Sequence, residues 1–82
     1  MSKLKKVYEK LMSGQGDKNF HFADLCYLLI KLGFDLRYTS GSHIVAQRGQ
    51  AYANIQNIGG KAKSYQVEQV RQTLKKNNIK PE

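Results

Sequence analysis

The 82-residue sequence has few of the residues from which disulfide frameworks and metal centres are built. Its single cysteine, Cys26, excludes an internal disulfide and lies in an apolar run, where a buried thiol is the usual occupant. Two separated histidines and one cysteine give no zinc-ligand pattern, and six scattered acidic residues give no carboxylate cluster for magnesium. We therefore expect neither a metal site nor a cofactor.

Acidic residues are scarce beside basic ones. Fourteen Lys and Arg against six Asp and Glu give a net charge of +8 and a pI of about 9.8. This balance favours a polyanionic partner, nucleic acid first, although a basic protein that docks an acidic protein has the same composition. The apolar run from Leu25 to Leu32 is too short to cross a bilayer, and residues 1–12 lack the apolar core of a secretory signal. We expect a cytoplasmic protein without a membrane-bound part.

Three segments have the periodicity of helices. Residues 3–13 carry a one-sided apolar stripe, whereas residues 22–32 are apolar on most sides and predict the main core helix. Gly33 is placed to end that helix in a left-handed cap. A last helix is predicted to reach about Asn77, with Ser64 as its N-cap.

One domain spanning residues 1–82 is predicted, because a chain of this length supports one compact core. The polar run of residues 13–19 contains two glycines and predicts a loop. Residues 1–19 are accordingly interpreted as a helical extension and loop, an appendage to a core of residues 20–79.

Three segments alternate between apolar and polar residues and predict strands: 34–39, 42–48 and 51–56. Their apolar positions, which include Tyr38 and Ile44, are expected to face the helices. The polar positions are expected to share the other face, and they are Asp35, Arg37, Thr39, His43, Gln47, Tyr52, Asn54 and Gln56. The fold class is α+β, with a three-stranded antiparallel sheet, helices on one face, and the order ααβββα.

His43 is the candidate catalytic residue. It follows the Gly41-Ser42 turn, and a histidine can accept or donate a proton near neutral pH. RNA cleavage needs a base for the 2′-hydroxyl and cations for the phosphate, and the candidate cations are Arg37, Arg48, Lys61 and Lys63. The alternative is that His43 merely ends a strand and hydrogen-bonds to the backbone.

Other motifs carry weaker signals. Gly59-Gly60-Lys61 lacks the rest of a phosphate-binding loop and is interpreted as a turn, although Lys61 can still contact phosphate. His21 is interpreted as a surface or capping residue, and Tyr65 as a packing residue at the start of the last helix in preference to one that stacks on RNA. Tyr52, Lys61 and Lys63 are further acid or base candidates by position only.

The order of these elements resembles that of the HicA-type toxins of bacterial toxin–antitoxin pairs. The resemblance covers about residues 22–77 and rests on Leu32-Gly33-Phe34, on Gly41-Ser42-His43, and on the Gly/Lys connection into a last helix. After the third strand many members have a proline and a further histidine, where this chain has Asn57-Ile58-Gly59-Gly60. The resemblance therefore assigns no second acid or base.

The resemblance implies a fold similar to a double-stranded-RNA-binding domain and an endoribonuclease that cleaves messenger RNA and so inhibits translation. It implies that His43 is catalytic, that Gly41 and Ser42 form its turn, and that a HicB-type antitoxin neutralises the protein. We expect cleavage of single-stranded messenger RNA without metal, in a bacterial cytoplasm. The alternative is a non-catalytic RNA-binding module, which needs the same charge and fold. An adaptor for an acidic protein would lack the salt slope of roughly −3 expected when about four phosphates are neutralised.

Overall fold

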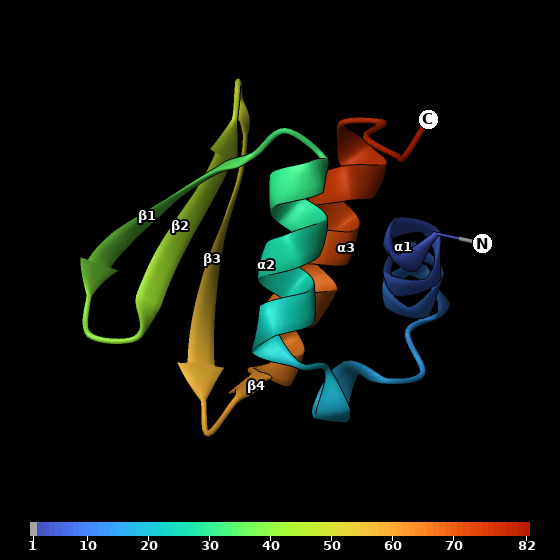
Figure 1. Ribbon diagram of the computed structural model, residues 1–82. Coiled ribbons are helices and arrows are strands. Elements are labelled where there is room, and N and C mark those ends of the chain that lie inside the picture. Colours follow the sequence, from blue (N-terminus) through green and yellow to red (C-terminus); the bar gives the residue numbers. More distant parts are fainter. Residues whose placement is uncertain (1) are drawn as a thin grey trace.

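A computed structural model describes residues 2–82, so residue 1 of the predicted domain lies outside it. The chain forms an α+β fold (Figure 1). Its elements, in order, are α1 (Lys3–Ser13), the 3-10 helix η1 (Asp17–Asn19), α2 (Phe22–Lys31), β1 (Asp35–Ser40), β2 (His43–Arg48), β3 (Ala51–Ile58), β4 (Lys61–Ala62) and α3 (Ser64–Lys76). The predicted class and the order of the main elements are confirmed.

The sheet has four antiparallel strands in the order β1-β2-β3-β4, so the prediction of three strands is wrong. The connection that was interpreted as a turn also contains β4, whose Lys61 pairs with Ile58. Gly59 and Gly60 have φ values of 60° and 90°, and two successive positive φ values form the tight turn that joins antiparallel strands. The Gly-Gly pair was the sequence signal for this additional hairpin.

Helices α2 and α3 lie on one side of the sheet, and α1 lies beyond them on the side away from the strands (Figure 1). The predicted faces of β2 and β3 are confirmed, because Ile44, Ala46 and Ile55 are buried beneath the helices. The helices contribute the larger share of the core: Val7, Leu11, Leu25, Leu28, Leu29, Val67, Val70 and Leu74.

The N-terminal segment that was interpreted as an appendage shares this core. Val7 and Leu11 of α1 are buried, and Phe20 is fully buried just after η1. The Arg71 guanidinium on α3 donates to the Leu11 carbonyl (3.0 Å) and to both carboxylate oxygens of Asp17 (2.9 and 3.0 Å). The segment therefore shares the apolar core of the domain and is tied to α3 by a bidentate ion pair.

Helix ends follow the sequence closely, with one correction. Gly33 has a φ of 90° directly after the α2 cap residue Leu32, as predicted for a left-handed helix end. Ser64, however, is the first residue of α3 and not its N-cap. Lys63 takes the cap position with extended backbone, and its carbonyl accepts hydrogen bonds from the N–H groups of Gln66 and Val67.

Tyr38 is a second correction, because it was expected to face the core and is 80% exposed. It pairs with the buried Ile44, so its side of the sheet is the expected one. However, β1 is the outermost strand, and its last residues lie near the β1–β2 turn, away from α2 (Figure 1). No helix among the described residues covers the sheet there, so the tyrosine ring meets solvent.

Candidate functional site

The face of the sheet that the helices leave uncovered is named the open face here. Strand register and burial place on it the polar residues predicted from the alternation except Thr39, which lies in a register irregularity of β1 between Tyr38 and Ser40, together with the half-buried Val45. Across the strands, Ser40, His43 and Gln56 form one row, and Arg37, Val45 and Asn54 form the next. The predicted strand phases thus bring His43 and the hydrogen-bonding residues of three strands to one surface.

His43 is the first residue of β2 and is exposed on the open face. The preceding Gly41 has a φ of 53°, a left-handed conformation that suits glycine in a tight turn. The Thr39 hydroxyl donates to the His43 carbonyl at 3.5 Å, so the contact that holds this residue engages its backbone. Among residues 2–82, no hydrogen bond or ion pair engages the imidazole. His43 thus stands at a strand end with its backbone hydrogen-bonded, as in the alternative, while its imidazole has no such partner among these residues.

Two of the predicted cations lie at the same end of the sheet as His43. The Asn57 N–H donates to the Ser42 carbonyl at 3.4 Å, and Asn57 pairs with Ala62 in β4. Lys61 and Lys63 flank Ala62; Lys61 is exposed, and its amine donates to the Asn19 side chain at 3.0 Å. The short strand β4 thus places Lys61 and Lys63 at the end of the sheet where His43 lies.

The two predicted arginines have other surroundings. Arg37 lies on the open face, but its guanidinium donates to Gln47 Oε1 at 2.7 Å, toward the end of β2 opposite His43. Arg48 lies at that far end of β2, on the side of the helices, and donates to the Leu32 carbonyl at 3.1 Å. Arg37 therefore shares a face with His43, whereas Arg48 is not brought to it.

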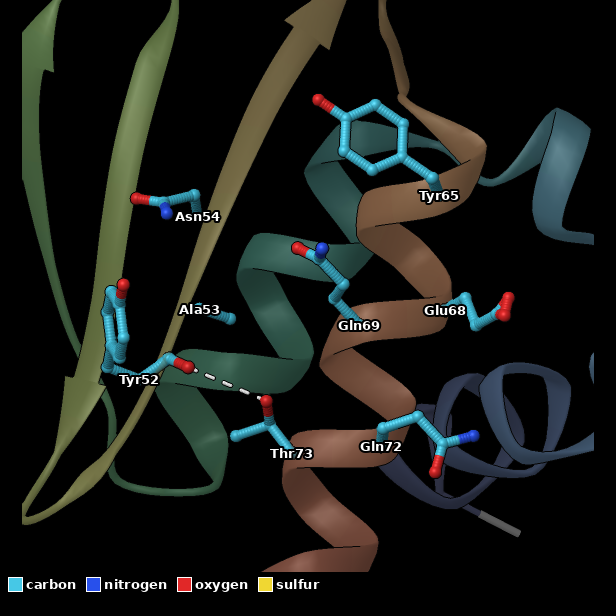
Figure 2. A pocket seen from close by; sticks show the side chains of 8 residues that line it. All are labelled: Tyr52, Ala53, Asn54, Tyr65, Glu68, Gln69, Gln72 and Thr73. Atoms are coloured by element: carbon cyan, nitrogen blue, oxygen red, sulfur yellow. Dashed lines mark hydrogen bonds between the residues drawn. The ribbon is translucent and has the colours of Figure 1, made fainter.

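A groove between β3 and α3 adjoins the open face and was not predicted. It has a volume of about 600 Å³, and its lining residues are Tyr52, Ala53, Asn54, Tyr65, Glu68, Gln69, Gln72 and Thr73. Figure 2 shows Tyr65 and Gln69 extending from α3 toward β3. Tyr65 is 55% exposed, so its interpretation as a packing residue is wrong.

Helical phase could have found the groove side of α3. Tyr65 precedes the buried Val67 by two residues, which is about 200° around a helix with 3.6 residues per turn. Gln69 and Gln72 follow Tyr65 at spacings of four and seven, so the three form one exposed stripe. The stripe lies largely opposite the buried face.

The remaining titratable candidates take no part in this arrangement. His21 is exposed at the N-cap position of α2 and forms an isolated bridge with Lys61. Cys26 is free and half-buried, and burial raises the pKa of its thiol. Within residues 2–82, no three His, Cys, Asp or Glu side chains lie together as metal ligands. No helix in that range is long and apolar enough to cross a membrane.

Comparison with known proteins does not assign the chain to a family. No family model matches it, and no curated protein or solved structure matches it either. The function proposed below therefore depends on the geometry of the open face and on the motif resemblance.

Proposed function

We propose that the protein is a HicA-type toxin, an endoribonuclease that cleaves single-stranded messenger RNA with His43 as general acid or base. The observation that carries this proposal is the exposed imidazole of His43 on a polar sheet face, with Lys61 and Lys63 at the same end of the sheet. A base must reach the 2′-hydroxyl, and cations must stabilise the charge that develops on the phosphate. The net charge of +8 supports a polyanionic substrate.

The chemistry requires a proton acceptor and a proton donor. The imidazole takes the proton of the 2′-hydroxyl, whose oxygen attacks phosphorus and forms a new P–O bond. The bond to the 5′-oxygen breaks, and that oxygen gains a proton from a second group or from solvent. The products are a cyclic phosphate and a 5′-hydroxyl, and no step requires a metal ion or a cofactor.

The finer structural and cellular assignments belong to the same proposal. The antiparallel sheet with helices on one face supports a double-stranded-RNA-binding-domain-like fold. A HicB-type antitoxin is the expected partner, and the bacterial cytoplasm is the expected location. Covering the exposed His43 would be sufficient for such an antitoxin to block cleavage.

The test is digestion of a labelled single-stranded RNA in excess chelator. His43→Ala should lower the cleavage rate by about 10²- to 10⁴-fold, the usual contribution of positioned proton transfer. His21→Ala is the matched control, because His21 is the other histidine of the chain and should leave the rate unchanged. Undiminished cleavage by folded His43→Ala would refute the assignment, and cleavage only after metal is added would refute the mechanism.

A non-catalytic RNA-binding module is the second candidate, and the groove between β3 and α3 favours it. Its tyrosines and amides can hold RNA without any chemistry. Turnover separates the two functions: RNA bound by the wild type and recovered intact, with no cyclic phosphate ends, would establish the binding module.

A further inference from the structure

The groove between β3 and α3 continues past Tyr52 along the same helix. A second hollow of about 420 Å³ shares Tyr52, Gln72 and Thr73 with the first and extends it toward Lys76. Together the two hollows follow residues 51–54, the first half of β3, and most of α3. This is an elongated surface, suited to an extended chain and not to a compact small molecule.

The lining of the groove fits nucleobases. Tyr52 and Tyr65 are each more than half exposed, and exposed aromatic rings are the usual stacking platforms for unpaired bases. The side-chain amides of Asn54, Gln69 and Gln72 each offer both a donor and an acceptor to base edges.

Charge is arranged around the groove in a way that fits a single nucleic-acid strand. Lys63 lies at one end, with its amine 5.6 Å from the centre of the Tyr65 ring, and Lys76 lines the other end. Glu68 is the charged residue in the lining of the first hollow, and its carboxylate disfavours phosphate there. A strand that places its bases in the groove and its phosphates at Lys63 and Lys76 fits both the lysines at the ends and the carboxylate in the lining.

A peptide that adds a strand to β3 fits less well. The β3 edge facing the groove carries the Tyr52 carbonyl, which already accepts from the Thr73 hydroxyl at 3.5 Å. Helix α3 packs along the same strand, so a further strand would have to displace it. Nucleic acid therefore explains both the lining and the charge.

The groove leads to His43. Tyr52, Asn54 and Gln56 are successive open-face positions of β3, separated by about 7 Å each at the rise of an extended strand. Gln56 is the direct cross-strand partner of His43. An RNA strand held at Tyr52 and Asn54 thus runs along the sheet to the imidazole.

We propose that this groove binds the unpaired bases of the RNA segment next to the phosphodiester that His43 cleaves. Tyr65 and Tyr52 stack on bases, and the amides of Asn54 and Gln69 set the base preference. The inference rests on the proposed ribonuclease function for the cleavage step alone, because RNA binding in the groove is measurable without turnover.

Binding is tested in the His43→Ala background, with fluorescence anisotropy of a labelled unstructured RNA of about 15 nucleotides, long enough to fill a single-strand site. Tyr65→Ala should weaken affinity about tenfold, the effect of losing one stacked base. Tyr38→Ala is the matched control, since Tyr38 is the more exposed tyrosine but lies outside the groove, and it should leave affinity unchanged. Equal affinities of the two variants would overturn the proposal.

Base preference gives an independent measurement. Gln69→Leu keeps the exposed helix position but removes the amide, so in an otherwise wild-type chain it should flatten the distribution of cleavage sites on a mixed-sequence RNA. An unchanged distribution would overturn the role of Gln69. This variant also provides the binding test if Tyr65→Ala does not fold, with a several-fold loss of affinity expected.

The outcomes separate this proposal from the ribonuclease proposal. Weakened binding by Tyr65→Ala together with no cleavage by the wild type supports the groove and refutes the ribonuclease. Cleavage by the wild type together with unchanged binding by Tyr65→Ala and Gln69→Leu supports the ribonuclease and refutes the groove. If the groove binds a peptide, and neither the wild type nor any variant binds RNA, the groove is refuted as an RNA site.

Discussion

Arginines in two regions of the molecule are used in opposite ways. Between α1, η1 and α3, the Arg71 side chain is 11% exposed and donates to Asp17 and to the Leu11 carbonyl. On the open face, Arg37 is exposed and donates to the neutral amide of Gln47. The first charge is compensated within the fold, whereas the second remains available to an anion. Net charge alone therefore does not tell which cations can meet RNA.

The pKa of the Arg71 guanidinium reflects the same difference. Its side-chain hydrogen bonds to Asp17 raise the pKa further above its already high ordinary value. A group with a raised pKa stabilises the fold below its unfolded-state pKa and loses that contribution only as pH rises through the folded value. For Arg71 both values lie far above neutrality, so its protonation gives no pH dependence in the working range.

Removing Arg71 should have the largest effect on stability. Arg71→Ala leaves the partly buried Asp17 carboxylate without its donor and removes one of the two donors to the Leu11 carbonyl, and should lower the free energy of unfolding by about 2–3 kcal/mol. Arg37→Ala is the matched control and should change it by less than about 0.5 kcal/mol. Urea unfolding followed by circular dichroism measures both, and equal losses would show that the two arginines stabilise the fold equally.

Arg48→Ala should give a smaller loss of stability, although its charge predicted that Arg48 binds RNA. Its guanidinium donates to the Leu32 carbonyl at the C-terminal end of α2, where a cation also meets a favourable helix dipole. Arg48→Ala should lower the free energy of unfolding by about 1 kcal/mol.

RNA titration distinguishes the two roles of Arg48. If its main role is to cap α2, Arg48→Ala should weaken RNA binding less than Lys63→Ala does, because Lys63 lies beside the groove and at the His43 end of the sheet. If Arg48→Ala weakened RNA binding more than Lys63→Ala, Arg48 would belong to the RNA interface after all.

Features that a local sequence pattern determines were predicted, whereas features that depend on contacts between distant residues were not. The faces of β2 and β3 followed from alternation within each strand, so the exposure of His43 and the burial of Ile44 were both anticipated. The pairing of Arg71 with Asp17 joins residues 54 positions apart, and no local pattern contains it. The exposure of Tyr38 likewise depends on how far α2 extends over the sheet.

The same distinction between local patterns and long-range contacts applies to the candidate site. The Gly41-Ser42 turn and strand phase placed His43, whereas the position of Lys61 at the same end of the sheet required the β3–β4 pairing. That pairing had a local signal in Gly59-Gly60. The groove needed both the phase of α3 and the packing of α3 along β3, and the second is a property of the tertiary structure.

Gln66 tests the same contrast from the polar side, and its replacement should raise stability instead of lowering it. It is 5% exposed on the buried face of α3, and among residues 2–82 its Oε1 has no hydrogen-bond partner. A buried acceptor without a partner costs about 1 kcal/mol or more, and an apolar side chain of similar shape avoids this cost. Gln66→Met should therefore raise the free energy of unfolding by about 1 kcal/mol.

The matched control for Gln66 is Gln69→Met, one turn along the same helix and exposed in the groove. It removes an amide that water already solvates, and should change the free energy of unfolding by less than about 0.5 kcal/mol. Parallel urea titrations compare the two. A loss of stability in Gln66→Met would mean that its amide donates a hydrogen bond that outweighs the unpaired oxygen. The buried side of α3 would then resemble the region around Arg71, where polar groups hold the fold together.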